Sequence, residues 1–240
     1  MLYSILVSVH VGAGCVGLAT FWLAAALRKG TRLHRRIGAT YLLALCVVIA
    51  TTPFLAAAAF AAGQPVIGTF LAYLTVITAT AAWSAWRAIR DRAAPAAFFG
   101  RGYVALAWLN LASGAVVLAL GLATNQLVLV GMSVIGLALG VDRLRRARRP
   151  VITSGWWLRQ HYAAILGCGI ATHIAFLSIG LRKLLPEWAT LTPYLGWFAP
   201  LAIAMLAKVW LDRRYGRGAR GAALVGPRAG AETGAGATAR

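Results

Sequence analysis

Long apolar segments divide this chain and leave little sequence between them. They cover residues 4–27, 37–61, 66–86, 103–123, 125–141, 161–181 and 194–211. A helix needs about 20 apolar residues to cross the hydrocarbon core of a bilayer, and most of these segments approach that length. Because 60% of the residues are hydrophobic and only 12% are charged, a soluble domain of this size could not bury the apolar surface. The sequence therefore predicts an all-α transmembrane helix bundle of about seven spans.

The fifth segment is short, and the sequence leaves open whether it crosses the membrane fully. As helix, residues 103–141 would reach about 58 Å, which is enough for two crossings. Asn125 and Gln126 mark the expected turn between the two spans. Residues 1–212 are predicted to form the bundle. Residues 213–240 are rich in Gly, Ala and Arg and are predicted to be a disordered, basic cytoplasmic tail.

The net charge of +19 is concentrated in short clusters between the apolar segments. This distribution is typical of membrane topology, and nucleic acid is not an expected partner. Of the 24 basic residues, 22 fall within 28–36, 87–101, 142–160 and the region from Lys208 onward, which share one side of a seven-span bundle. Only Arg182 and Lys183 fall on the other side. The positive-inside rule predicts an outside N-terminus, a cytoplasmic C-terminus and a multi-pass location in a bacterial inner membrane.

The chain offers few groups for catalysis. Its three cysteines (Cys15, Cys46 and Cys168) stand singly inside apolar segments and are expected to be small buried residues. All five acidic residues lie in loops or at segment ends, whereas proton-coupled transporters usually place a carboxylate within the membrane. No hydrolase or phosphate-binding motif is present. No catalytic residue is predicted, and whether the protein is an enzyme stays open.

Four histidines form two pairs at two predicted depths. His10 and His173 belong to the outer halves of their segments, while His34 and His161 lie at the inner boundary. On one helix, His161 and His173 point about 120° apart, so they would face different neighbouring helices. We therefore expect two separate sites, an outer pair of His10 with His173 and an inner pair of His34 with His161.

Axial imidazole pairs hold haem iron in electron-transfer proteins. We hypothesise that the four histidines are iron ligands of haem b, with up to two haems in the membrane. The basic residues near the inner pair, expected to bind haem propionates, are Arg35, Arg36 and Arg159. A quinone or another redox partner would exchange electrons with such haems. A single metal ion shared by all four histidines is excluded by their separation in depth.

The alternative is a cofactor-free membrane protein, such as a small transporter, an assembly factor or a partner subunit. In that case the outer histidines hydrogen-bond neighbouring helices, and the inner histidines are ordinary interfacial residues. Glycines at one-turn spacing from three of the histidines, Gly14, Gly38 and Gly169, suit either hypothesis. Such a glycine leaves room for a flat macrocycle beside the ligand and equally permits close helix packing. The oligomeric state is not determined by these features.

The segment "HVGAGCVGLATFWLAAALRKGTRLHRRIGATYLLA" resembles an uncharacterised bacterial membrane family, domain of unknown function 2306. The pattern comprises His10, Gly12, Gly14, Lys29, Gly30, His34, Arg35, Arg36, Gly38 and Tyr41. The later stretch "WWLRQHYAAIL", with Trp157 and His161, is a weaker match. This resemblance implies a membrane protein without a particular activity. The arrangement of the four histidines is also similar to that of two-haem membrane b-type cytochromes, which implies transmembrane electron transfer.

The charge distribution predicts the sidedness of fusion proteins. A reporter fused after Arg240 is expected in the cytoplasm, and one inserted at Gly63 is expected outside, because the basic clusters hold their ends of the spans on the cytoplasmic side. Paired phosphatase and fluorescent-protein fusions measure this directly. An active phosphatase at Arg240 would contradict the seven-span topology.

Overall fold

A computed structural model of the protein describes residues 1–148, 152–181 and 192–222. Within these ranges, seven helices are long and apolar enough to cross a membrane, which confirms the predicted all-α bundle. They are α1 (Leu2–Ala26), α2 (Arg32–Ala61), α3 (Pro65–Arg90), α5 (Arg101–Ala123), α6 (Leu127–Arg148), α7 (Trp156–Ala175) and α9 (Thr192–Ala222). A short helix, α4 (Pro95–Phe98), precedes α5, and a π-helical segment, η1 (Phe176–Leu181), continues α7.

The shortest predicted span proves to be a long helix. α6 runs from Leu127 to Arg148, past the predicted end at residue 141. The added turns carry Arg145, Arg146 and Arg148, and cations near a helix C-terminus interact favourably with the helix dipole. The turn before α6 lies where it was predicted, because Asn125 adopts a left-handed backbone conformation with φ of 51°.

The last helix also extends beyond its predicted end. Residues 213–222, which the sequence assigned to the basic tail, form the final turns of α9. Residues 223–240, the rest of the predicted tail, lie outside the described residues. So do Arg182 and Lys183, the two basic residues predicted for the opposite side of the membrane.

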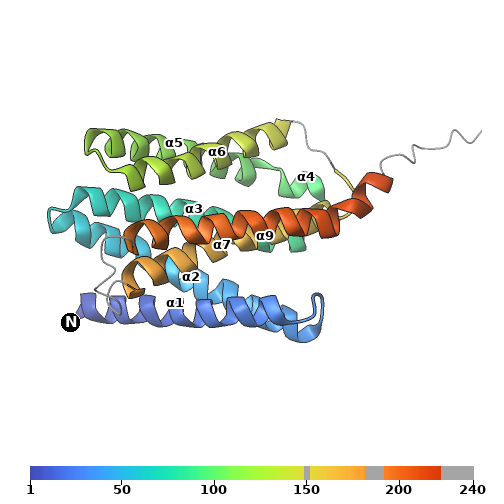
Figure 1. Ribbon diagram of the computed structural model, residues 1–240, viewed down its shortest axis with the longest axis horizontal. Coiled ribbons are helices and arrows are strands. Elements are labelled where there is room, and N and C mark those ends of the chain that lie inside the picture. Colours follow the sequence, from blue (N-terminus) through green and yellow to red (C-terminus); the bar gives the residue numbers. More distant parts are fainter. Residues whose placement is uncertain (149–151, 182–191, 223–240) are drawn as a thin grey trace, which may run out of the picture.

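The helices alternate in direction, so the basic clusters gather at one end of the bundle. Figure 1 shows the α1–α2 connection, α4 and the C-terminal part of α9 at this end, with the N-terminus and the α5–α6 turn at the other. We call the end with the α1–α2 connection and α4 the basic end. Large apolar side chains remain exposed along the outside, for example Trp22, Leu43, Trp108, Ile203 and Leu206. A multi-pass protein in contact with lipid accounts for this exposure.

Glycines allow α5 and α6 to form the most extensive helix pair of the described bundle. A Cβ atom added at Gly140 would lie 2.8 Å from Ala107 O and 2.6 Å from Leu111 Cγ. A Cβ atom added at Gly121 would lie 2.9 Å from Val130 N. Small residues let transmembrane helices approach closely and gain van der Waals contact, which replaces the missing hydrophobic driving force in lipid.

Buried apolar clusters connect the other helices to this pair. One cluster joins α3, α5, α6 and α7 through Tyr73, Val117, Leu129, Met132 and Ile174. A second joins α2, α3 and α7 through Tyr41, Leu45, Ala82 and Cys168. A third closes the basic end with Ala88, Phe98, Tyr103 and Trp156. Together they hold α3 and α7 at the centre of the bundle.

The cysteines are only partly as expected. Cys168 is buried, but Cys15 and Cys46 are exposed on the surface of the bundle. The expectation of burial was wrong for these two because a small apolar side chain is accommodated by lipid as well as by a protein core.

Substitution of Gly140 tests the close approach of α5 and α6. We expect Gly140→Ala to lower the free energy of unfolding by about 1–3 kcal/mol, because the new methyl group would meet a backbone carbonyl that cannot turn away. Unfolding in detergent micelles measures the change. Gly12→Ala is the matched control, since a Cβ there meets no atom within 4 Å. Equal losses in the two variants would contradict the packing argument.

Candidate functional site

The connection between α1 and α2 fixes the position of His34. Gly30 has φ of 82°, a conformation that glycine adopts without strain. Thr31 caps α2 by accepting a hydrogen bond from the backbone N–H of His34 at 3.2 Å. Lys29 Nζ and His34 Nδ1 both donate to Ala24 O at the end of α1, at 2.9 and 3.1 Å. The motif that carries the family resemblance therefore builds a tight turn that holds the His34 ring against α1.

His161 is held in a similar way at the start of α7. Its Nδ1 lies 3.0 Å from Ala85 O of α3. A carbonyl only accepts, so Nδ1 carries a proton in His161 and likewise in His34, and in the neutral form of each ring Nε2 keeps its lone pair. Neither Nε2 has a hydrogen-bond partner in the described part of the chain. Metal-binding histidines commonly have this arrangement, in which the ring nitrogen that does not bind the metal donates a hydrogen bond to a carbonyl oxygen.

The two histidines of the predicted inner pair lie in the same region of the bundle. His34 and His161 lie close enough to interact electrostatically, although they are far apart in the sequence. Arg35 and Arg36 follow His34 and are exposed on the first turns of α2. Arg159 interacts electrostatically with Asp212 of α9, and its role as a propionate ligand stays a prediction.

The outer histidines have separate partners. His10 Nδ1 lies 2.8 Å from Thr51 Oγ1 of α2. The Thr51 hydroxyl donates to the carbonyl oxygens of Val47 and Val48, so it accepts the bond from His10. Like the inner histidines, His10 therefore has a protonated Nδ1 and a lone pair on Nε2.

His173 uses both ring nitrogens. Its Nδ1 donates to Gly169 O at 2.7 Å, and its Nε2 accepts from the Trp22 indole N–H at 2.9 Å. A Cβ at Gly169 would lie 2.6 Å from the Phe21 ring, so this glycine accommodates Phe21. By contrast, a Cβ at Gly14 would meet no atom within 4 Å.

The outer pair is not brought into contact. Trp22, which bonds to His173, lies about 18 Å further along α1 than His10. The His10 ring is directed instead to Thr51 of α2. For the two histidines to share an iron ion, His173 would have to leave Trp22, and the separation of about 18 Å along α1 would also have to close. The outer haem site stays a prediction.

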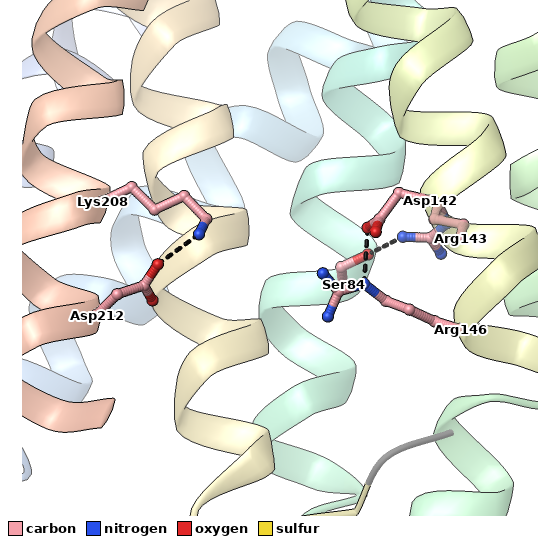
Figure 2. A network of polar contacts seen from close by, with 6 residues as sticks. All are labelled: Ser84, Asp142, Arg143, Arg146, Lys208 and Asp212. Carbon is pink, nitrogen blue, oxygen red and sulfur yellow. Dashed lines mark hydrogen bonds and ion pairs between the residues drawn. The ribbon is translucent and has the colours of Figure 1, made fainter. Parts of the chain in front are cut away.

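Arg143 is a buried residue that the sequence reasoning counted only as topogenic charge. It is 4% exposed, and its Nη1 donates to Ser84 Oγ of α3 at 2.8 Å. Figure 2 shows Ser84, Arg143, Asp142 and Arg146 gathered between α3 and α6. The sequence did indicate that Arg143 is buried, because Arg143 follows Gly136 and Gly140 at helical spacing and so lies on the same packed face of the helix.

No group of three or more His, Cys, Asp or Glu side chains within residues 1–148, 152–181 and 192–222 is positioned to hold a bare metal ion. A search for related protein families, curated proteins and solved structures finds no match to this chain. Any assignment of function therefore rests on the geometry of the residues themselves.

A double-mutant cycle tests the contact between Trp22 and His173. We expect Trp22→Phe and His173→Leu to show a coupling energy of about 0.6 kcal/mol and at most about 1.7 kcal/mol, the range of hydrogen bonds between membrane helices. Unfolding in micelles provides the four free energies. Trp22→Phe combined with His10→Leu is the control and should be additive, because the two residues share no contact. A coupling energy between Trp22 and His10, with none between Trp22 and His173, would contradict the assigned partners.

Proposed function

We propose that this protein binds b-type haem between His34 and His161 and carries electrons across a bacterial inner membrane. One observation carries the proposal: two imidazoles from distant parts of the chain lie within range of an electrostatic interaction at the basic end, each with Nδ1 fixed by a carbonyl and Nε2 unpartnered among the described residues. A bis-imidazole haem supplies a one-electron carrier. The role of the chain is to fix the tautomer and the direction of each ring.

The surroundings of His34 fit a flat, anionic ligand. Gly38 lies one turn after His34, and a Cβ added there would meet no atom within 4 Å, so the helix face beside the histidine is open. Arg35 and Arg36 are exposed on the same turns and are free to pair with carboxylates such as haem propionates. No hydrogen bond or ion pair of either side chain occurs within the described bundle.

A second haem at the outer pair meets two obstacles in the structure. It needs the lone pair of His173 Nε2, which the Trp22 indole occupies. Phe21 also fills the space beside Gly169. The inner site is therefore proposed to bind first, with a quinone in the bilayer or another redox partner completing the path of the electrons.

The competing function is that of a cofactor-free membrane protein, such as a transporter, an assembly factor or a partner subunit. The specific observation in its favour is that every histidine already makes a structural hydrogen bond. His34 caps α1, His161 links α7 to α3, His10 links α1 to α2, and His173 links α7 to α1. Hydrogen bonds of this kind stabilise membrane bundles without any ligand.

Absorption spectroscopy separates the two proposals. Protein purified from haem-replete cells is expected to show a Soret band that shifts on reduction with dithionite. His34→Ala and His161→Ala should each remove the same haem, because an axial pair fails when either member is lost. His10→Ala should leave that haem unchanged. Colourless wild-type protein would overturn the haem proposal and support the cofactor-free one.

Filling the space beside His34 gives a test that leaves every histidine in place. Gly38→Phe is expected to abolish haem binding, since the ring would occupy the face on which the macrocycle lies. Gly12→Phe is the matched control, because a Cβ at Gly12 also meets no atom within 4 Å but lies on α1 away from the inner pair. Haem stoichiometry and the yield of folded protein are measured together. Undiminished haem in Gly38→Phe would contradict the proposed position.

A further inference from the structure

The guanidinium of Arg143 has donors that nothing in the described structure accepts. Its Nη1 is bonded to Ser84 Oγ, but Nε and Nη2 are buried without a hydrogen-bond partner. An unpaired buried donor is costly, and the cost rises for a charged group. Such groups in native proteins are usually paired with a bound water or an ion.

The aromatic rings around Arg143 do not supply the missing partners. The Tyr103 ring lies 3.8 Å from the guanidinium carbon, and the Trp83 ring lies 5.7 Å from it. Cation–π contact stabilises the charge through the face of the guanidinium plane. The N–H groups point outward in that plane, so its edge still needs acceptors.

The nearby carboxylates are also committed elsewhere. Asp142 is bonded to Arg146 at 2.7 Å, as Figure 2 shows, and Asp91 is bonded to Arg87. Arg87 shares the Trp83 ring with Arg143, so these pairs surround the same site. Asp142 interacts electrostatically with Arg143 but makes no hydrogen bond to it, so Nε and Nη2 of Arg143 remain without acceptors in a region of low dielectric constant. A bound anion would be strongly attracted there.

We propose that Arg143 is the centre of a binding site for one small monovalent anion, such as chloride, between α3, α5 and α6. Nε and Nη2 donate to the anion edge-on, while Tyr103 covers the face of the guanidinium. The cluster of Phe98, Tyr103 and Trp156 packs over this end of the bundle, which restricts the occupant to a small ion. The proposal does not depend on haem, because the anion site uses none of the four histidines.

The proposal includes one water molecule beside the anion. Asn110 is fully buried, and its Oδ1 has no partner within the described chain, whereas its Nδ2 donates to Thr80 Oγ1 at 2.8 Å. Thr80 O in turn accepts from the Ser84 hydroxyl, and Ser84 is the partner of Arg143. The Asn110 side chain therefore lies about one turn of α3 away from the Arg143 guanidinium. An anion cannot donate to Asn110, so a water molecule that bridges the two groups completes both sets of bonds.

Thermal unfolding with chloride tests the proposal. At constant ionic strength, replacing gluconate with chloride is expected to raise the Tm of the wild type, because an anion that binds only the native state stabilises it by mass action. The rise should be lost in Arg143→Met and kept in Arg145→Met. Arg145 is the matched control, since it lies on the same helix and is exposed. Equal Tm values in chloride and gluconate for the wild type would overturn the anion site.

Arg143→Lys covers the case in which Arg143→Met does not fold. Lysine keeps the charge but lacks the planar fork, so the chloride concentration that gives half of the Tm rise should increase about tenfold. An unchanged concentration in Arg143→Lys would show that the ion binds elsewhere and overturn the assignment.

Bromide locates the ion by quenching fluorescence. A saturable component of quenching is expected in the wild type and in Arg145→Met, and it should disappear in Arg143→Met and Trp83→Phe. Purely linear quenching in all four proteins would indicate water alone beside Arg143 and overturn the proposal.

Phosphorus analysis of the purified protein tests whether a lipid phosphate occupies the site. Loss of one bound phospholipid in Arg143→Met, with no halide response in the wild type, would replace the small ion by a lipid phosphate.

Discussion

The bilayer provides no water to polar groups inside the bundle, and this constraint determines how its polar side chains are arranged. Helices satisfy the backbone, but a buried side chain must find a partner on another helix or on the preceding turn. Tyr73 donates to Met132 O and accepts from Gly136 N–H across the α3–α6 interface. Asn110 bonds to α3 and to its own helix. Polar contacts therefore link the helices that the glycines bring close together.

The same constraint gives the histidines a common tautomer. His34, His161 and His173 each direct Nδ1 to a backbone carbonyl, which can only accept. Nε2 is then the nitrogen available to a ligand. The two pairs differ in what Nε2 meets, because the indole of Trp22 reaches His173 while the inner nitrogens have no partner in the described bundle. The outer pair differs further, because Trp22, the partner of His173, lies about 18 Å along α1 from His10.

The sequence was sufficient for the spans because the length of an apolar run is a direct measure of membrane crossing. It could not fix which helix faces which. α1 and α5 are apolar on nearly all sides, so periodicity does not select a buried face. The partner of His10 on α2 and the approach of Trp22 to His173 depend on rotations that only packing decides. Arg143 was missed for another reason, since counting charges along the chain ignores which helix face carries each one.

Helix α3 connects the two proposed sites. Its consecutive residues Ser84 and Ala85 contact Arg143 on one side and His161 on the other. A fixed positive charge in a medium of low dielectric constant favours the more negative state of any neighbouring redox group. An anion bound at Arg143 would cancel that charge and weaken the effect. With both sites occupied, the reduction potential of a haem at the inner histidines would therefore fall as the anion binds, and the adjacent contacts of Ser84 and Ala85 would keep the two charges close.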